Sequence, residues 1–257
     1  MEEYESLSHT KWKCKYHVAF IQKCRRKALY VELRKYLGEV FRHLAQQEES
    51  RIEEGMATLR KSGCVLVEAD IPDLEELYTA ARQPISYYEM FHDLSRYLEE
   101  SGAKVEAKEV IAQIASHDVK AAYLTFGIGP KASTRKEYET AMKHDRPAIQ
   151  ACYRNYFRAH NVPAIVFPTT ILPARPIGRD DGVELNGKRF PTLAIYIHNT
   201  RPMTVTGIPG MSLPVGLTAD GRPVGLELDA PEGTDRNLLG LGLAIERLFR
   251  KLPSPQG

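Results

Sequence analysis

The stretch Asn199–Leu248, NTRPMTVTGIPGMSLPVGLTADGRPVGLELDAPEGTDRNLLGLGLAIERL, decides the fold of the C-terminal part of this chain. The apolar run Val224–Leu228 follows a turn at 220–222 (Asp-Gly-Arg), a pattern that predicts a strand entered from a tight turn. Asp235–Lys251 is predicted to be a helix, with Thr234 placed to cap it. Its expected core positions recur at helical spacing and are Leu238, Leu241, Ile245 and Leu248.

The residues before that stretch alternate between helical and strand-like patterns. Residues 163–167 (PAIVF) have the composition of a buried strand and lead into 168–178 (PTTILPARPIG), whose prolines exclude a helix. A rigid loop that leaves a strand end is a common position for a ligand pocket in open α/β sheets. Residues 64–69 (CVLVEA) predict another strand, and 73–160 are rich in helical patterns. The sequence therefore predicts an α/β protein.

The N-terminal residues have a different character. Seven Lys or Arg and no acid lie between Lys11 and Lys27, although the net charge of the whole chain is only +2. Lys11–Phe20 alternates apolar with mainly basic residues, which predicts a strand with one buried face. Val31–Gln47 predicts a helix, and Arg51–Glu54 can begin a further strand. We therefore divide the chain into residues 1–55 and residues 56–257.

Cysteine content and hydropathy bound the cellular setting. The cysteines are Cys14, Cys24, Cys64 and Cys152, and no two of them have CxxC spacing. We therefore expect no disulfide framework, no metal centre and a cytoplasmic location. The N-terminus MEEYESLSHTKWK lacks the apolar stretch of a signal peptide, and no apolar run is long enough to predict a membrane span.

Three tracts resemble amidase-signature enzymes, and among these the branch of indoleacetamide and mandelamide hydrolases. They are 59–74 (LRKSGCVLVEADIPDL), 164–178 (AIVFPTTILPARPIG) and Asn199–Leu248. Together they span nearly all of 57–250 in the order that the family has. The resemblance implies an α/β/α fold with a mixed central sheet, incomplete in this chain. It also implies a family activity, the hydrolysis of the C–N bond of a small amide substrate without a cofactor.

The catalytic groups that the resemblance implies are missing from this sequence. Members of the family use a Ser–cis-Ser–Lys triad, and a Gly/Ser-rich loop resembling GGSSGGS holds the oxyanion. This chain has no such loop, and the catalytic lysine belongs to the front half of the family, which has no counterpart here. We therefore assign no catalytic residue and expect no hydrolysis by this chain alone.

The resemblance does suggest substrate-binding residues. The family loop that matches Phe167-Pro-Thr-Thr170 approaches the acyl site, so Thr169 and Thr170 are candidates for lining a substrate pocket. The alternative is that both hydroxyls cap a turn. We expect Asn199 to bridge backbone groups and His198 to be a half-exposed helix residue.

Residues 6–55 resemble a second family, the HUH-type tyrosine transposases of small bacterial insertion sequences. The most specific part is 15–29 (KYHVAFIQKCRRKAL). The resemblance implies a metal-binding His-x-His motif and a catalytic tyrosine, but none of the eight histidines of the chain forms that motif. DNA cleavage is therefore not expected. Weak, salt-sensitive contacts with nucleic-acid phosphates remain open for Lys11, Lys13, Lys15, Arg25 and Arg26, and the alternative is a solvated strand face.

Three hypotheses for function follow. The first is an amidase-family protein that is inactive by itself. The second is a transposase-derived DNA-binding fragment, and the third is a non-catalytic pseudoenzyme subunit that completes another chain. A fusion of two incomplete folds leaves strand edges and apolar faces uncovered, so we also expect self-association.

Overall fold

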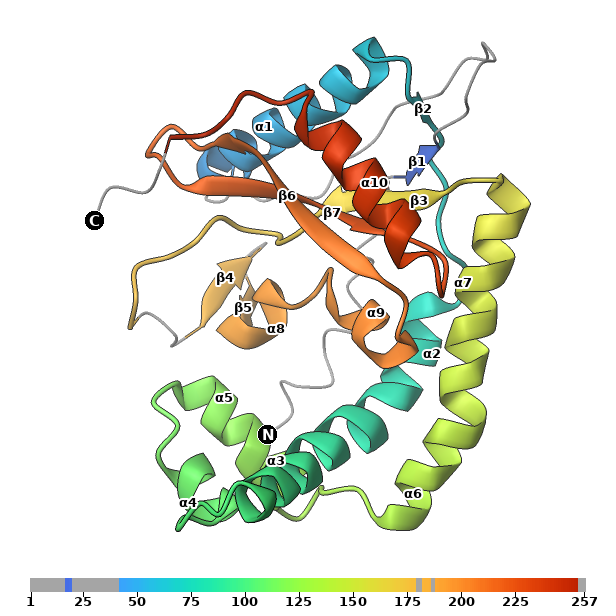
Figure 1. The fold of residues 1–257 in the computed structure, drawn as a ribbon. Coiled ribbons are helices and arrows are strands. Elements are labelled where there is room, and N and C mark those ends of the chain that lie inside the picture. The colour runs from blue at the N-terminus through green and yellow to red at the C-terminus, as the bar shows by residue number, and fades with distance from the viewer. Residues whose placement is uncertain (1–16, 20–41, 179–181, 186–187, 254–257) are drawn as a thin grey trace.

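The computed structural model describes residues 17–19, 42–178, 182–185 and 188–253 (Figure 1). Its strands are β1 (His17–Ala19), β2 (Val65–Leu66), β3 (Ala164–Pro168), β4 (Val183–Leu185), β5 (Lys188–Phe190), β6 (Gly210–Leu217) and β7 (Pro223–Asp229). Its helices are α1 (Arg42–Lys61), α2 (Leu74–Arg82), α3 (Tyr88–Glu100), α4 (Ala107–Ala112), α5 (His117–Ala122), α6 (Arg135–Thr140), α7 (Arg146–His160), α8 (Thr192–Tyr196), α9 (Arg201–Thr206) and α10 (Asp235–Glu246). Three π-helical segments lie among them: η2 (Gln83–Tyr87), η3 (Tyr123–Gly127) and η4 (Ala141–Asp145).

Five of these strands form one sheet in the order β2-β1-β3-β7-β6, and β4 and β5 form a separate hairpin. Each neighbouring pair in the five-stranded sheet is antiparallel. Strands β6 and β7 make a long hairpin, with Gly210 opposite Asp229 at one end and Leu217 opposite Pro223 at the other. The strand predicted at Val224–Leu228 is confirmed as the centre of β7.

Helices cover both faces of the sheet. On one face, Leu226 and Leu228 of β7 pack with buried residues of α1 and α10. On the other face, Ile165 and Phe167 of β3 pack with α2, α7 and α9. This α/β fold with helices on two sides confirms the predicted class, whereas the mixed sheet that the resemblance implies is not seen among the described strands, whose pairs are all antiparallel. Within the described residues, no helix is long and apolar enough to cross a bilayer.

Strand β1 brings the N-terminal segment into the sheet. Its Val18 lies opposite Leu66 of β2 on one side and Ala164 of β3 on the other. The strand predicted over Lys11–Phe20 is therefore present at His17–Ala19, and the rest of that stretch lies outside the described residues. The N-terminal strand thus finds pairing partners within the C-terminal portion.

The strand predicted to begin at Arg51–Glu54 is wrong, because these residues lie inside the continuous helix α1. The reason is the spacing of Ile52, Met56 and Leu59, which recur at helical intervals and are 2%, 1% and 0% exposed. The division between residues 55 and 56 falls within this helix and stays a prediction. The helix is followed at Gly63 by a positive φ of 94°, as its glycine leads us to expect.

Helix α10 is shorter than predicted. It ends at Glu246, and Leu248 is 38% exposed instead of buried. Leu238 and Ile245 are buried at 3% and 1%, as their spacing predicts. Once the helical turn stops, Leu248 no longer lies on the face that those two residues share.

Candidate functional site

Strand β7 carries two buried acids in a strand that is otherwise largely apolar. Glu227 and Asp229 are 6% and 2% exposed and lie two residues apart, so both side chains point to the same face of the sheet. Their antiparallel neighbours on β3 are Phe167 and Ile165. Buried carboxyl groups need hydrogen-bond partners or lose their charge. This face of the sheet therefore needs polar groups close to Glu227 and Asp229.

Two hydroxyl groups meet the requirement of Glu227. Thr169 follows the end of β3, Ser212 lies on β6, and both side chains hydrogen-bond to the Glu227 carboxyl group. The Thr169 and Ser212 hydroxyls also hydrogen-bond to each other across β7. We call Thr169, Ser212, Glu227 and Asp229 the acid–hydroxyl cluster.

Gly225 makes this contact across β7 possible. A Cβ atom at this position would lie 2.8 Å from Ser212 Oγ and 2.8 Å from Thr169 Oγ1, closer than real side chains approach. The backbone helps as well, because Thr169 N donates a hydrogen bond of 3.0 Å to Gly225 O. Glycine is therefore required here by the space that the two hydroxyls occupy.

The two acids have raised pKa values for the same main reason. Burial raises the pKa of Glu227, and the hydrogen bonds from Thr169 and Ser212 partly oppose that increase. Burial also raises the pKa of Asp229 well above its usual range, and the nearby Glu227 adds to the effect. Asp229 Oδ1 is buried without a hydrogen-bond partner, so the neutral acid is the form that this environment favours.

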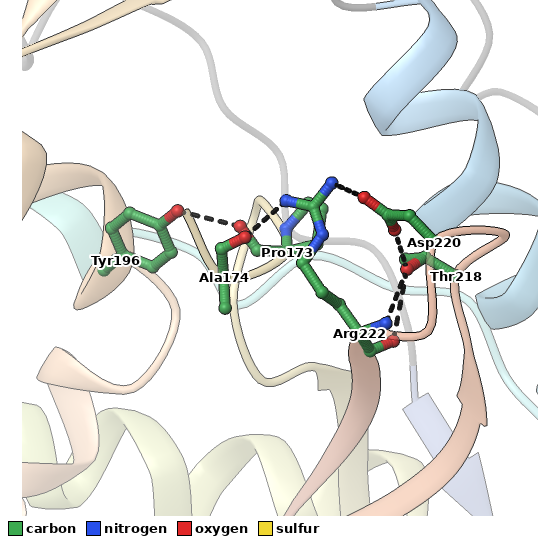
Figure 2. A network of polar contacts seen from close by, with 6 residues as sticks. All are labelled: Pro173, Ala174, Tyr196, Thr218, Asp220 and Arg222. Carbon is green, nitrogen blue, oxygen red and sulfur yellow. Dashed lines mark hydrogen bonds and ion pairs between the residues drawn. The ribbon is translucent and has the colours of Figure 1, made fainter. Parts of the chain in front are cut away.

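A second polar network holds the loop that follows Thr169 (Figure 2). Tyr196 of α8 donates a hydrogen bond of 2.8 Å from its hydroxyl to Pro173 O, and Arg222 donates to Ala174 O from the other side. Arg222 is itself paired with Asp220, whose carboxylate also accepts a hydrogen bond from Thr218. Arg222 and then Thr218 lower the pKa of Asp220 to about 2.

This network explains how a loop rich in proline keeps one position. Prolines lack the N–H groups that would tie a loop to its neighbours, so the carbonyl groups must serve instead. Tyr196 of α8 holds the carbonyl of Pro173, and Arg222 in the turn between β6 and β7 holds the carbonyl of Ala174, as Figure 2 shows. The loop predicted from the sequence is therefore held between α8 and the turn that joins β6 to β7.

The two predicted threonines have different surroundings. Thr169 joins the acid–hydroxyl cluster, whereas Thr170 Oγ1 donates a hydrogen bond of 2.8 Å to Leu172 O within a turn. Asn199 Nδ2 donates a hydrogen bond of 2.7 Å to Pro168 O, so it bridges to the backbone as expected. His198 is partly buried, and burial followed by the charge of Arg201 lowers its pKa to about 4.

Ser212 and Glu227 were missed by the sequence reasoning. A signal for Glu227 was present, because an acid interrupts the apolar run VGLEL of a predicted strand. Ser212 had no comparable signal, since its proximity to Thr169 depends on the order of β3, β7 and β6. The basic residues proposed for nucleic acid, Lys11, Lys13, Lys15, Arg25 and Arg26, lie outside the described residues.

The cluster supplies hydrogen-bond donors and acceptors, and burial raises the pKa of both of its acids. Such groups can orient a polar ligand such as an amide, but a neutral acid is a poor nucleophile. Over the ranges that the structure describes, no group of three or more His, Cys, Asp or Glu is arranged to hold a metal ion. Because the two acids are buried, the hydroxyls of Thr169 and Ser212 are the groups of the cluster that could contact a polar ligand.

Replacing Gly225 tests the packing of the cluster. Gly225→Ala forces a methyl group against both hydroxyls, and we expect it to lower the free energy of unfolding by about 1–3 kcal/mol. Gly240→Ala is the matched control, because a Cβ there meets nothing within 4 Å and alanine favours a helix. Urea denaturation of both variants measures the difference. Equal stability of Gly225→Ala and the unmodified protein would contradict this account of the glycine.

The pH dependence of stability tests the state of Asp229. An acid whose pKa is raised on folding adds stability that is full below its unfolded pKa, about 4, and is lost as the pH rises toward the folded value. Asp229→Asn imitates the neutral acid at every pH. We expect the variant to exceed the original protein in stability by about 1–3 kcal/mol at neutral pH. Unfolding measured from about pH 5 to 8 should show that advantage growing with pH, and a constant difference would argue against a neutral Asp229.

Comparison with known proteins relates this chain to a family. A family model described as "Amidase" matches residues 36–239, and a model described as "Transposase IS200 like" matches residues 10–59. The indoleacetamide hydrolase of Agrobacterium vitis is 43% identical over 203 residues, which are 78% of this chain and 43% of that protein. The mandelamide hydrolase of Pseudomonas putida is 27% identical over 230 residues, or 85% of this chain and 44% of that protein.

Solved structures agree with the sequence relatives. A crystal structure of an amidase has a TM-score of 0.59 and 27% identity, and the match covers 82% of this chain and 44% of that one. The structure of 6-aminohexanoate cyclic dimer hydrolase, at 18% identity and a TM-score of 0.60, shares the fold over 81% of this chain and 42% of its own. The chain thus spans less than half the length of these relatives. Since the family model matches most of the sequence and a relative exceeds 40% identity, this chain belongs to the amidase family.

Proposed function

We propose that this chain is the C-terminal, substrate-positioning portion of an amide hydrolase that cannot hydrolyse amides alone. The observation that carries the proposal is the acid–hydroxyl cluster beside a fixed loop, in a chain that belongs to the amidase family. The relatives hydrolyse indoleacetamide or mandelamide according to their names, which favours a small amide with an aromatic group as the substrate.

Thr169 has the central role in this proposal. Its hydroxyl contacts Ser212 and Glu227, and Gly225 keeps the space that this contact needs. A hydroxyl in such a network can turn to donate to a carbonyl oxygen or accept from an amide nitrogen. Thr170 is a weaker candidate, because its hydroxyl is bonded to the nearby Leu172 O and makes no contact with the acid–hydroxyl cluster. The attacking serine, the second serine and the lysine would come from the family's other half.

Ammonia release tests this proposal. We expect the purified chain to release no ammonia from indoleacetamide or mandelamide above a protein-free control. Co-expression with the portion of the Agrobacterium vitis relative outside the matched segment should restore release, and Thr169→Val should then reduce it by about tenfold or more, the usual cost of one transition-state hydrogen bond. Thr170→Val is the control and should have a smaller effect. Turnover by the chain alone would overturn the proposed inactivity.

A DNA-binding role is the second candidate, and the match of residues 10–59 to IS200-like transposases favours it. The basic residues between Lys11 and Lys27 would contact phosphates, with an affinity that falls as salt rises. A gel-shift titration with hairpin DNA at increasing salt measures this. We expect weak binding at low salt only, and an unshifted hairpin at low salt would exclude the role.

We propose that residues 1–55 and 56–257 have separate origins, and that the protein acts in the cytoplasm, where its cysteines stay reduced. Cys64 and Cys152 are both free thiols, which is consistent with that setting. A pseudoenzyme subunit and a self-associating fragment are alternatives within this picture, since each follows from an incomplete sheet.

A further inference from the structure

Strand β6 is an open edge of the main sheet. Across the described ranges it pairs with β7 alone, whereas its other side meets no strand. Pro209 O accepts a hydrogen bond of 3.0 Å from Ala230 N, so alternation along the strand turns the backbone groups of Gly210, Ser212 and Pro214 away from β7. The N–H groups of Gly210 and Ser212 and the three carbonyl groups thus face outward, where they can pair with another strand.

The opposite edge of the sheet offers far fewer backbone groups for pairing with another strand. Strand β2 there has two residues, whereas β6 has eight. Natural proteins keep exposed edge strands short or blocked, because a long free edge invites pairing with another chain. Strand β6 is therefore the edge with the longer run of outward-facing backbone groups, which extends from Gly210 to the irregularity in register at Pro214–Gly216.

Helix α10 adds an apolar strip to the same side of the molecule. Leu239 and Leu243 lie one helical turn apart and are 63% and 51% exposed. Both are on the flank of α10 next to Gly242, the residue at which the helix packs against Met211 of β6. Gly240, also exposed, leaves open space where a partner could approach the helix closely.

We propose that the β6 edge and the Leu239–Leu243 flank form one docking surface, and that its partner is the amidase-family segment that lies outside the part of the relatives matched by this chain. The inference rests on the proposed function. Its main support is length: the matches cover 43% and 44% of the relatives, so more than half of each has no counterpart here. A strand of that segment would extend the sheet at β6, and apolar residues beside it would cover the two leucines.

Co-purification tests the surface. The tagged chain is co-expressed with the portion of the Agrobacterium vitis relative outside the matched segment, and the recovered partner and the ammonia released from indoleacetamide are both measured. Leu239→Glu/Leu243→Glu places two charges in the proposed contact. We expect about a tenfold or greater loss of recovered partner, the effect of disrupting a central apolar contact.

The matched control is Leu124→Glu, which alters a leucine that is 46% exposed on η3. It should leave recovery unchanged. Because Leu239 and Leu243 are exposed, the double variant should keep the original melting temperature. Leu239→Ser/Leu243→Ser provides a milder version that introduces no charge, and it should give an intermediate loss.

The outcomes separate the docking surface from the proposed function. Recovery that survives the double variant, or that Leu124→Glu abolishes, would overturn the surface even if ammonia is released. A complex that depends on the two leucines but releases no ammonia would support the surface and count against the amide-hydrolase proposal. Failure to recover any partner, or a homodimer held by the same leucines, would replace the proposed partner and overturn the inference.

Discussion

The two faces of β7 impose opposite demands on the rest of this chain. One face carries Val224, Leu226 and Leu228, each 1% exposed, and requires an apolar cover that α1 and α10 provide. The other face carries Gly225, Glu227 and Asp229, and Glu227 has hydroxyl partners in Ser212 of β6 and in Thr169, which directly follows β3. Most of the organisation of the C-terminal portion follows from meeting both requirements at once.

The demands of the polar face also explain the loop after β3. A carboxyl group as deeply buried as Glu227 loses the solvation of water, so its hydrogen bonds to Thr169 and Ser212 replace part of it. Thr169 is held by its backbone hydrogen bond to Gly225 and by its hydroxyl contact with Ser212, and the chain that follows it is fixed as well. Arg222 and Tyr196 fix it through the carbonyl groups of the Pro173–Ala174 segment.

Local pattern predicted the elements better than it predicted their contacts. The apolar run in β7, the stripe of Leu238 and Ile245 and the proline-rich loop depend on neighbouring residues, and the structure contains each. Ser212 and Glu227 escaped notice because strand order brings them to Thr169, and no spacing in the sequence encodes that order. The amidase family itself could be identified from three short tracts, whereas the site residues needed the sheet.

Short stretches of sequence were also insufficient to predict helix α1. Arg51–Glu54 has too few apolar residues to show a period by itself, and only together with Met56 and Leu59 does the helical interval emerge. A division of the chain at residue 55 concealed that continuity. The pairing of β1 was equally hidden, since a strand of three residues gains its place from β2 and β3 and not from its own composition.

The continuity of α1 bears on the boundary between the two family matches. The transposase-like match ends at residue 59 and the amidase match begins at residue 36, so the overlap includes most of this helix. Adding or removing one codon between Ile52 and Leu59 would rotate everything upstream by about 100° and carry Ile52 away from the core. The helical phase between these residues therefore has to be kept for the apolar face of α1 to stay continuous across the overlap of the two matches.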